Sequence, residues 1–392
     1  MKLGKRIAYV GLMLLVLCMS IVSVSTNAVY AYEGMSAVTN IAVGHMHSIA
    51  LKSDGTVWTW GRNSNGQLGD GTRWTRKTPV QVSDLSDIQA VTTGRHHSMA
   101  LKSDGTVWAW GANVNGILGD GTATQRTTPV QSSGLSDIQA IAGQMSHSMA
   151  LKNDGTVWAW GNNTYGQLGN GTTTSSMTPV QSSELSNIKA IDGDSFYSIA
   201  LKSDGTVWTV GNNTYGQLGD GTTVNKTVPV QVSGLSDIKA IAGGGYHSIA
   251  LKNDGTVWAW GRNEHEQLGD GTTVDRTTPV QVNGLSDIKA IAGGYEYNMA
   301  LKNDGTVWAW GINNVGQLGM GTNEKISGPV QVSELSDIQA IAAGSQHSIA
   351  LKSDGTLWTW GLNSYGQLGN GETLASFTPV QVSGLNLFPT PH

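Results

Sequence analysis

The sequence has little cysteine, little phenylalanine and few charged residues. Its single cysteine, Cys18, lies in an apolar segment near the N-terminus, so the rest of the chain holds no disulfide, thiol nucleophile or thiolate metal site. Charged residues make up 13% of the chain, and no segment shows the apolar period of a helix. These absences exclude a disulfide-stapled domain, a thiol enzyme and a helical bundle.

The net charge is also low. It is -5 for the whole chain and -8 without residues 1–31, which carry three cations and no carboxylate. A nucleic-acid-binding protein presents a basic face, so we expect no nucleic acid as a partner. Against these absences stand 52 Gly and 14 Trp, which indicate many turns and large buried rings rather than disorder.

The N-terminus has the pattern of a signal peptide. Lys2, Lys5 and Arg6 precede an apolar run at 7–24, and Ala31 supplies a small residue for cleavage. We therefore expect residues 1–31 to be removed and the protein to be secreted or held at the cell surface. The apolar run has 18 residues, just enough to cross a bilayer, so an uncleaved membrane anchor is the alternative.

One stretch, L-K-S-D-G-T-V-W-A-W-G at 101–111, returns in nearly the same form every fifty positions. Seven units of fifty residues fill 35–384, and residues 385–392 remain as a C-terminal tail. Within the stretch, Asp104-Gly105 separates two runs of β pattern, which predicts a hairpin with a type I′ turn. A fixed period of this length indicates one array of repeats rather than several domains.

Each unit contains four runs of β pattern, which in the second unit are 88–92, 97–102, 106–110 and 127–131. Seven units of four short strands predict an all-β fold, a seven-bladed β-propeller. Tryptophan pairs such as Trp108 and Trp110 would each bury about 150–250 Å² per ring between blades. A β-solenoid is the alternative, but the sequence has no polar capping unit, which favours a closed ring.

The motif W-G-x-N-x-x-G-Q-L-G-x-G-T, as in 60–72 and 160–172, follows G-x-x-H-S-[IM]-A-L in most units. It resembles the regulator of chromosome condensation repeat, and this family implies a seven-bladed propeller over residues 35–384. The resemblance also implies two precedents for function. These are guanine-nucleotide exchange on a small nuclear GTPase and inhibition of β-lactamase by a secreted bacterial propeller.

Four units depart from the motif. Val210 replaces the second Trp, Ile117 a Gln, Glu266 a Gly and Glu372 a Thr. We expect no loss of fold from these changes. Val210, however, should leave a shallower contact between blades, because it is much smaller than the Trp of the other units.

Antiparallel order places two connections, from strand one to two and from three to four, at one end of each blade. The opposite end is nearly uniform among units, whereas this end differs. Aromatic, Arg and His residues on the loops of a rigid scaffold are typical of a recognition surface. The alternative is that exposed loops drift after duplication. The candidate partner-binding residues are His45, Met46, Trp74, Arg76, Arg95, His96, Phe196, Tyr246, His265, Tyr295 and Glu296.

Five units place a histidine at the start of the second strand, and two place a tyrosine there: His47, His97, His147, His247, His347, Tyr197 and Tyr297. Imidazole is a common metal ligand. Symmetry would spread these side chains around a wide axis, so we favour hydrogen bonds to the backbone within each blade. We expect no metal and no cofactor.

Two clusters of titratable groups break the repeat, Glu264-His265-Glu266 and the pair Asp192 and Asp194. Acid–base catalysis needs such groups to converge within hydrogen-bond reach. Convergence is a property of the folded chain rather than of the sequence, and solvated loop charge is the favoured account of both clusters.

The favoured function is that of an exported, monomeric, non-catalytic propeller that binds a protein partner through its variable loops. The alternative from another class is an envelope enzyme or glycan-binding propeller acting on polysaccharide, with Asp192, Asp194 or Glu264 as acid and base. Guanine-nucleotide exchange rests on the family resemblance alone. Export argues against it, because a nuclear GTPase is not met outside the cell.

Overall fold

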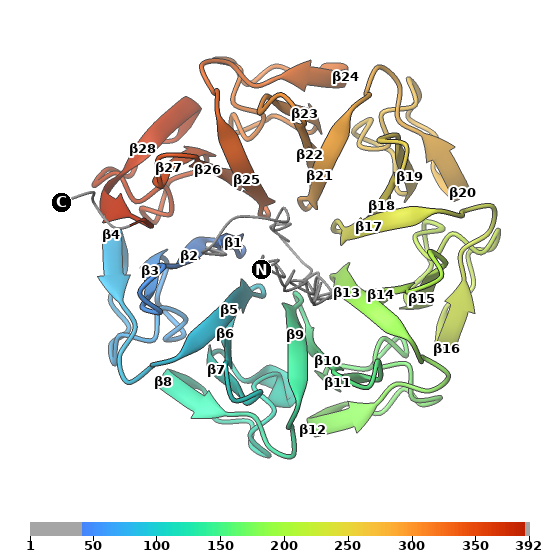
Figure 1. Ribbon diagram of the computed structural model, residues 1–392, viewed down its shortest axis with the longest axis horizontal. Helices are drawn as coiled ribbons and strands as arrows, with labels where there is room; N and C mark the ends of the chain where they lie inside the picture. The colour runs from blue at the N-terminus through green and yellow to red at the C-terminus, as the bar shows by residue number, and fades with distance from the viewer. Residues whose placement is uncertain (1–40, 389–392) are drawn as a thin grey trace, which may run out of the picture.

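The computed structural model describes residues 41–388, so the expected signal peptide and the alternative membrane anchor lie outside the described residues. The chain forms a ring of seven antiparallel sheets of four strands each (Figure 1). Every sheet, or blade, consists of four consecutive strands, with the first strand at the axis and the fourth at the rim. The predicted all-β, seven-bladed propeller is confirmed, and the solenoid alternative is excluded.

The strands of blades 1 to 4 are β1 (Ile41–Val43), β2 (His47–Leu51), β3 (Val57–Gly61), β4 (Arg76–Gln81), β5 (Ile88–Thr93), β6 (His97–Lys102), β7 (Val107–Gly111), β8 (Arg126–Gln131), β9 (Ile138–Gly143), β10 (His147–Lys152), β11 (Val157–Gly161), β12 (Ser176–Gln181), β13 (Ile188–Asp194), β14 (Tyr197–Lys202), β15 (Val207–Gly211) and β16 (Lys226–Gln231). Those of blades 5 to 7 are β17 (Ile238–Gly243), β18 (His247–Lys252), β19 (Val257–Gly261), β20 (Arg276–Gln281), β21 (Ile288–Gly293), β22 (Tyr297–Lys302), β23 (Val307–Gly311), β24 (Ile326–Gln331), β25 (Ile338–Ala343), β26 (His347–Lys352), β27 (Thr356–Gly361) and β28 (Ser376–Asn386). A single short 3₁₀ turn, η1 (Val114–Gly116), precedes Ile117 in the described chain.

The hairpin between the second and third strands does not have the expected type I′ turn. In the first blade, Gly55 N donates to Lys52 O (3.0 Å), and of the Asp-Gly pair only Gly55 has a positive φ (81°). The Asp54 carboxylate accepts hydrogen bonds from the backbone N and the hydroxyl of Thr56. This is a three-residue loop that ends in a bulge glycine. The repeated Asp therefore serves as an acceptor for Thr rather than as a left-handed residue.

The blades pack against one another through a repeated seam. The indole of Trp110 is fully buried, and its Nε1 donates to the backbone oxygen of Gln67 in the preceding blade (3.0 Å). A Cβ on Gly69 would lie 2.7 Å from the same Nε1, so the ring requires glycine there. Equivalent bonds of 2.8–2.9 Å join Trp60 to Gln367, Trp160 to Ile117, Trp260 to Gln217, Trp310 to Gln267 and Trp360 to Gln317.

The seam between blades 3 and 4 lacks this tryptophan. Val210 stands in its place, and a small cavity remains between Val210, Leu168 and Ser182. In this seam the Gln167 carbonyl accepts a hydrogen bond from the Ser198 hydroxyl (2.8 Å), but no indole donates to it. The expected shallower contact is confirmed, and the blades that carry Ile117, Glu266 and Glu372 keep all four strands.

The C-terminal end of the chain closes the ring. Leu387 is fully buried, its N donates to Gly355 O (2.9 Å), and its O accepts from Ser53 N in the first blade (3.1 Å). Between other blades, the connecting link makes the same kind of bond, as from Ile138 N to Gly105 O (3.3 Å). Residues 385–387 therefore take the place of a link between blades 7 and 1. The strand β28 continues to Asn386, past residue 384, where the seventh sequence repeat ends.

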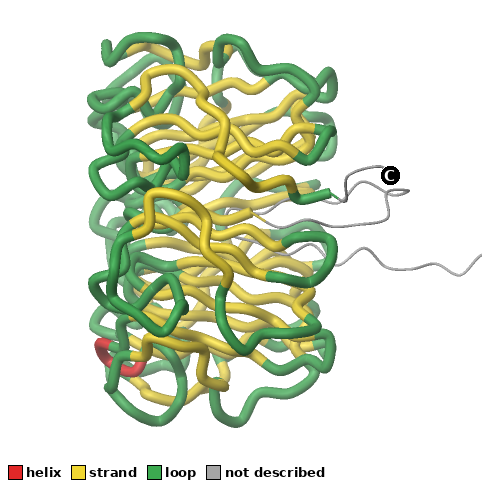
Figure 2. The backbone as a smooth tube through the Cα atoms, turned by 90° about the vertical axis from the view of Figure 1, so that its left-hand side faces the viewer, coloured by secondary structure: helices red, strands yellow, loops and turns green. Residues whose placement is uncertain are grey.

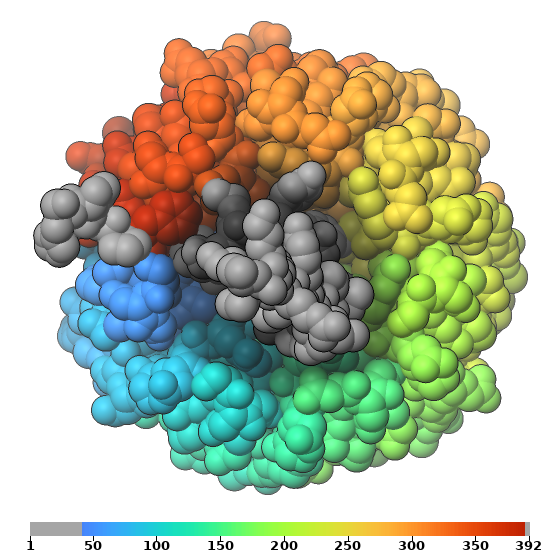
Figure 3. Space-filling view, viewed as in Figure 1, coloured from blue at the N-terminus to red at the C-terminus, as the bar shows by residue number. Residues whose placement is uncertain are grey.

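The two faces of the ring differ. The connections from strand one to two and from three to four emerge together on the left of Figure 2, and we call this side the loop face. The hairpins and links form the hairpin face, which Figure 3 shows from above, with the last blade (red) beside the first (blue). Between residues 41 and 388, the fold contains no helix long and apolar enough to cross a membrane.

Candidate functional site

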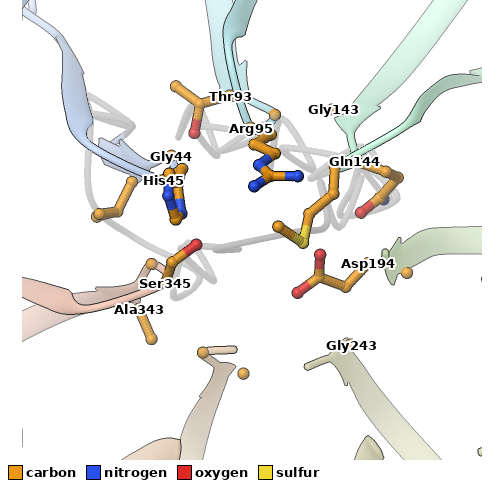
Figure 4. Close-up of a pocket in the computed structure, with 17 residues that line it drawn as sticks. Gly44, His45, Thr93, Arg95, Gly143, Gln144, Asp194, Gly243, Ala343 and Ser345 are labelled. Atoms are coloured by element: carbon orange, nitrogen blue, oxygen red, sulfur yellow. The ribbon is translucent and has the colours of Figure 1, made fainter. Parts of the chain in front are cut away.

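The candidate site is the loop face around the mouth of the central channel. The ends of the inner strands and the turns after them line this mouth, and most blades contribute glycine there. The side chains of Arg95, from blade 2, and Asp194, from blade 4, point into the mouth (Figure 4). Because glycines and only a few charged side chains line the mouth, a side chain of a partner could enter it.

Blades 1 and 2 contribute a group of cationic and imidazole side chains, Arg62, Arg95, His45 and His96, which we call the basic corner. The two imidazoles meet edge to face, with ring centroids 5.7 Å apart. Burial and the nearby positive charges of Arg95 and Arg62 lower the pKa of each imidazole to about 4. Both histidines are therefore neutral at physiological pH, and the positive charge of the corner comes from the arginines.

Arg62 of the basic corner contacts only neutral groups. Arg62 donates to the Ser64 hydroxyl (2.9 Å) and the Met46 sulfur (3.7 Å), and its guanidinium lies 5.3 Å from the Tyr365 ring centroid. Within residues 41–388, no carboxylate lies within ion-pair distance of Arg62 or Arg95. Neither arginine therefore has an ion-pair partner in the described chain, although the charge of Arg95 is near enough to oppose the burial that raises the pKa of Asp194.

Blades 5 and 6 carry a second group, which we call the paired cluster: Arg262, Glu264, His265 and Glu296. Arg262 Nη1 lies 2.6 Å from Glu296 Oε1, and His265 Nε2 lies 3.4 Å from Glu296 Oε2. Arg262 also pairs with Glu264, and its charge and hydrogen bond lower the pKa of that carboxyl group. The charges of this cluster thus satisfy one another.

Aromatic rings extend the paired cluster toward the channel. Tyr215 contacts Tyr246 with centroids 5.4 Å apart, and Tyr246 contacts Tyr295 at 6.0 Å. The Arg262 guanidinium lies 5.3 Å from the Tyr215 centroid. These tyrosines are half-buried and meet edge to face rather than being displayed singly.

The remaining candidates lie apart from these two groups. Trp74 is 74% exposed on the third-to-fourth connection of blade 1. Phe196 is half-buried against Tyr165, with centroids 5.2 Å apart. Arg76 pairs with Asp70 (2.8 Å), a bond that Arg126 and Asp120 repeat in the next blade, so it holds its own loop.

The structure therefore places His45, Met46, Arg95 and His96 together, and Tyr246, His265, Tyr295 and Glu296 together. The sequence reasoning did not single out Arg62, Arg262 or Tyr215. Arg62 and Arg262 occupy the x of W-G-x-N, which changes from unit to unit. That variation was the available signal, because it marks the same face as the chosen loops.

The repeated histidines hydrogen-bond across the seams, not within their own blades. His47 Nε2 lies 3.0 Å from the Ser98 hydroxyl of the next blade, and that hydroxyl donates to Gln67 O (2.8 Å). In one seam Asn298 replaces the serine, and its Oδ1 accepts from His247 Nε2 (2.8 Å). The proton of each neutral imidazole therefore sits on Nε2. The expectation of a bond within each blade was wrong, because the next blade offers the closer acceptor.

Tyrosine fills the same role in two seams. Tyr297 Oη donates to His347 O (2.8 Å) and lies 2.8 Å from the Ser348 hydroxyl. The histidines and tyrosines are thus part of the packing between blades. Among the residues that the structure describes, no three His, Cys, Asp or Glu side chains are grouped closely enough to hold a metal ion.

The carboxylates proposed for the enzyme alternative have different surroundings. Asp192 is 1% exposed and accepts from the backbone N of Gly193 and of Gly243 in the next blade, so it supports the seam. Burial raises the pKa of Asp194 at the mouth to about 7. Glu264 is held by Arg262. Asp192 is therefore closed off from a polymer substrate.

Comparison with known proteins gives the family. The model of the RCC1-like domain matches residues 18–336, and models of the regulator of chromosome condensation (RCC1) repeat match residues 338–367 and 354–389. A stretch of 50 residues is 40% identical to the RCC1 domain-containing protein RUG3, mitochondrial, of Arabidopsis thaliana, over 13% of this chain and 11% of that protein. A stretch of 52 residues is 40% identical to the probable E3 ubiquitin-protein ligase HERC6 of Homo sapiens, over 13% of this chain and 5% of that protein. The matches thus span about a tenth or less of these relatives.

Solved structures agree with the fold. Human WBSCR16 superposes with a TM-score of 0.76 at 22% identity, over 84% of this chain and 94% of that chain. Yeast RCC1 (Prp20), solved with Kap60 bound, superposes with a TM-score of 0.77 at 22% identity, over 97% of this chain and 91% of that chain. Together with the repeat motif and the seven blades, these matches show that the chain belongs to the family of RCC1-like domains built from regulator of chromosome condensation repeats.

Proposed function

We propose that this protein is an exported, non-catalytic ring that binds a protein partner through its loop face. The observation that carries the proposal is the division of the molecule into seams that repeat from blade to blade and one face that varies from blade to blade. The seams repeat the same Trp, Ser and backbone bonds, whereas the loop face shows an exposed Trp, arginines without an ion-pair partner and tyrosines in edge-to-face contact. Trp, Tyr and Arg are the residue types that dominate binding energy at protein interfaces.

Family members support a protein as the partner class. Yeast Prp20 has been solved bound to Kap60, and a second study of it concerns binding to Gsp1p and histones. Those partners belong to the yeast protein. For this chain, the signal-peptide pattern supports an extracellular or surface partner, which differs from a nuclear GTPase.

A capture experiment tests the proposal. The full chain is immobilised and exposed to culture medium and solubilised cell envelope, beside the variants Trp74→Ala/Tyr246→Ala on the loop face and Ser103→Arg on the hairpin face. We expect a stoichiometric protein partner that the Ser103→Arg variant retains and the loop-face variant binds at least about tenfold more weakly. Equal binding by all three would contradict the proposal.

The enzyme alternative is examined in the same preparation. Cell-wall glycans are incubated with the wild type and with Asp194→Asn, and released sugars are measured. Release that depends on Asp194 would replace the binding proposal with polysaccharide cleavage. We expect no release, because Asp192 is buried in a seam and Glu264 is held by Arg262, so neither is available to work with Asp194 as an acid–base pair.

A further inference from the structure

The two charged groups on the loop face differ in how their charges are satisfied. In the paired cluster, Arg262 contacts both Glu264 and Glu296, His265 lies beside Glu296, and Lys325 of blade 6 pairs with the nearby Glu266 (3.0 Å). In the basic corner, Arg62 and Arg95 contact no carboxylate of the described chain. A guanidinium is built to hold carboxylates with two parallel hydrogen bonds. The corner therefore offers donors that the described fold leaves unused.

The surroundings of the basic corner reinforce its positive charge. Arg73 lies on blade 1, as Arg62 does. Its guanidinium donates to the side-chain oxygen of Gln125, which is a neutral group. The carboxylates of these two blades' loops are already taken, Asp70 by Arg76 and Asp120 by Arg126. Asp194 is the carboxyl group that faces Arg95 across the mouth, and the two do not form an ion pair (Figure 4).

We propose that the basic corner anchors an acidic segment of the protein partner, with carboxylates binding Arg62 and Arg95 and an apolar side chain packing on Trp74. The inference rests on the proposed function and names the chemistry of the partner. Trp74 stands on the loop face of the same blade as Arg62, and Trp and Arg are among the residue types that dominate binding energy at interfaces. The seven blades are similar, so a partner could dock in several rotations about the ring axis. Positive charge on blades 1 and 2 alone would select one of these rotations.

A peptide probe tests this chemistry directly. Fluorescein-labelled peptides Gly-Glu-Leu-Glu-Leu-Glu-Gly and Gly-Lys-Leu-Lys-Leu-Lys-Gly are titrated with the full chain in 25 mM NaCl, and anisotropy is measured. The variant is Arg62→Gln/Arg95→Gln. The matched control, Arg126→Gln/Arg276→Gln, removes the same charge from the same face at arginines that already have carboxylate partners. Thermal unfolding verifies that each variant keeps the ring.

We expect the acidic peptide to bind at least tenfold more tightly than the basic one. The Arg62→Gln/Arg95→Gln variant should weaken the acidic peptide about tenfold, the control by less than about threefold, and 500 mM NaCl should remove most of the binding. Trp74→Ala should weaken it severalfold with the same salt dependence. Equal effects of the two double variants, or equal binding of both peptides, would overturn the proposal.

The captured partner separates failure of this inference from failure of the proposed function. If Trp74→Ala/Tyr246→Ala loses the partner while Arg62→Gln/Arg95→Gln retains it, the loop face binds protein but the acidic anchor is wrong. If no variant affects capture, the proposed function itself falls.

Discussion

Six of the seven seams between blades contain a buried tryptophan, whereas the seam between blades 3 and 4 contains Val210. In the six, an indole N–H and a Ser or Asn side chain share one backbone carbonyl. In the seventh, the Ser198 hydroxyl alone remains from that pair, and a cavity lies beside it. The ring therefore tolerates one weak seam because six strong ones surround it. We expect opening of the ring to begin between blades 3 and 4, since local unfolding follows the least-packed interface.

The largest expected effect comes from acid, which acts on every seam that holds a histidine. Burial lowers the pKa of His97, His147 and His347 to about 3 and of His247 to about 4, and that of His47 well below its usual value. The unfolded chain takes up protons below about pH 6.5, whereas the folded ring does not, so stability is complete above that pH and falls as pH drops toward 3. Each of these histidines lowers the free energy of unfolding by about 1.4 kcal/mol for each pH unit in this range.

Urea unfolding between pH 7 and pH 4.5, followed by tryptophan fluorescence, measures this loss. The variant His97→Tyr copies the tyrosine seam of Tyr297, which also has a glycine, Gly294, beside the ring. We expect this variant to reduce the slope of stability against pH by the contribution of one histidine, about 1.4 kcal/mol per pH unit. An unchanged slope would show that His97 does not stay neutral in the ring.

The second effect concerns the seam that the C-terminus closes. Removing residues 385–392 deletes Leu385 and Leu387, which are 5% and 0% exposed, and the bonds of Leu387 to Gly355 and Ser53. We expect a loss of about 5 kcal/mol in the free energy of unfolding, because two buried leucines go with the backbone bonds. Removing only residues 389–392 is the control and should change stability by less than about 0.5 kcal/mol.

A third test compares the strong and weak seams directly. Trp110→Val turns a strong seam into a copy of the weak one and should cost about 3 kcal/mol, since it removes a buried ring and one hydrogen bond. Val210→Ala in the weak seam should cost about 1–2 kcal/mol, because space beside Val210 is already open. Equal losses at both sites in urea unfolding would show that the seams do not differ in strength.

The smallest effects concern the Ser or Asn side chain that lies between the histidine ring of one blade and the shared backbone carbonyl of the seam. Ser98→Ala leaves His47 Nε2 without its acceptor and should cost about 1–2 kcal/mol. Asn298→Ser exchanges one bridging side chain for the one used in the other seams and should change stability by less than about 0.5 kcal/mol. Thermal unfolding of both variants, with wild type alongside, distinguishes the two.

Much of the fold could be predicted from the sequence because it repeats. The period, the four strands per unit, the two faces and the weak contact at Val210 all follow from comparing units within one chain. The turn type was wrong because the role of Asp54 as an acceptor depends on Thr56 two residues later. The closing role of the tail could not be predicted, because Leu387 makes through backbone hydrogen bonds the connection that a link between blades makes elsewhere.

The candidate site could be predicted only in part. Its face and most of its residues follow from where the units differ. Which charges pair could not be predicted, because Arg262 meets Glu296 from the next blade, whereas Arg62 meets neutral groups. Contacts between blades depend on their relative tilt, and a repeat pattern contains no information about that tilt.

The shared acceptor of each seam is a main-chain oxygen, and a main-chain oxygen cannot be mutated away. Ile117 shows the result: the glutamine side chain is gone, yet Trp160 and Ser148 still donate to the Ile117 carbonyl at 2.8 and 2.9 Å. The side chains of the loop that contains that carbonyl can therefore change while the hydrogen bonds between the blades remain. Engineers who graft new binding residues onto these loops can treat that position as replaceable.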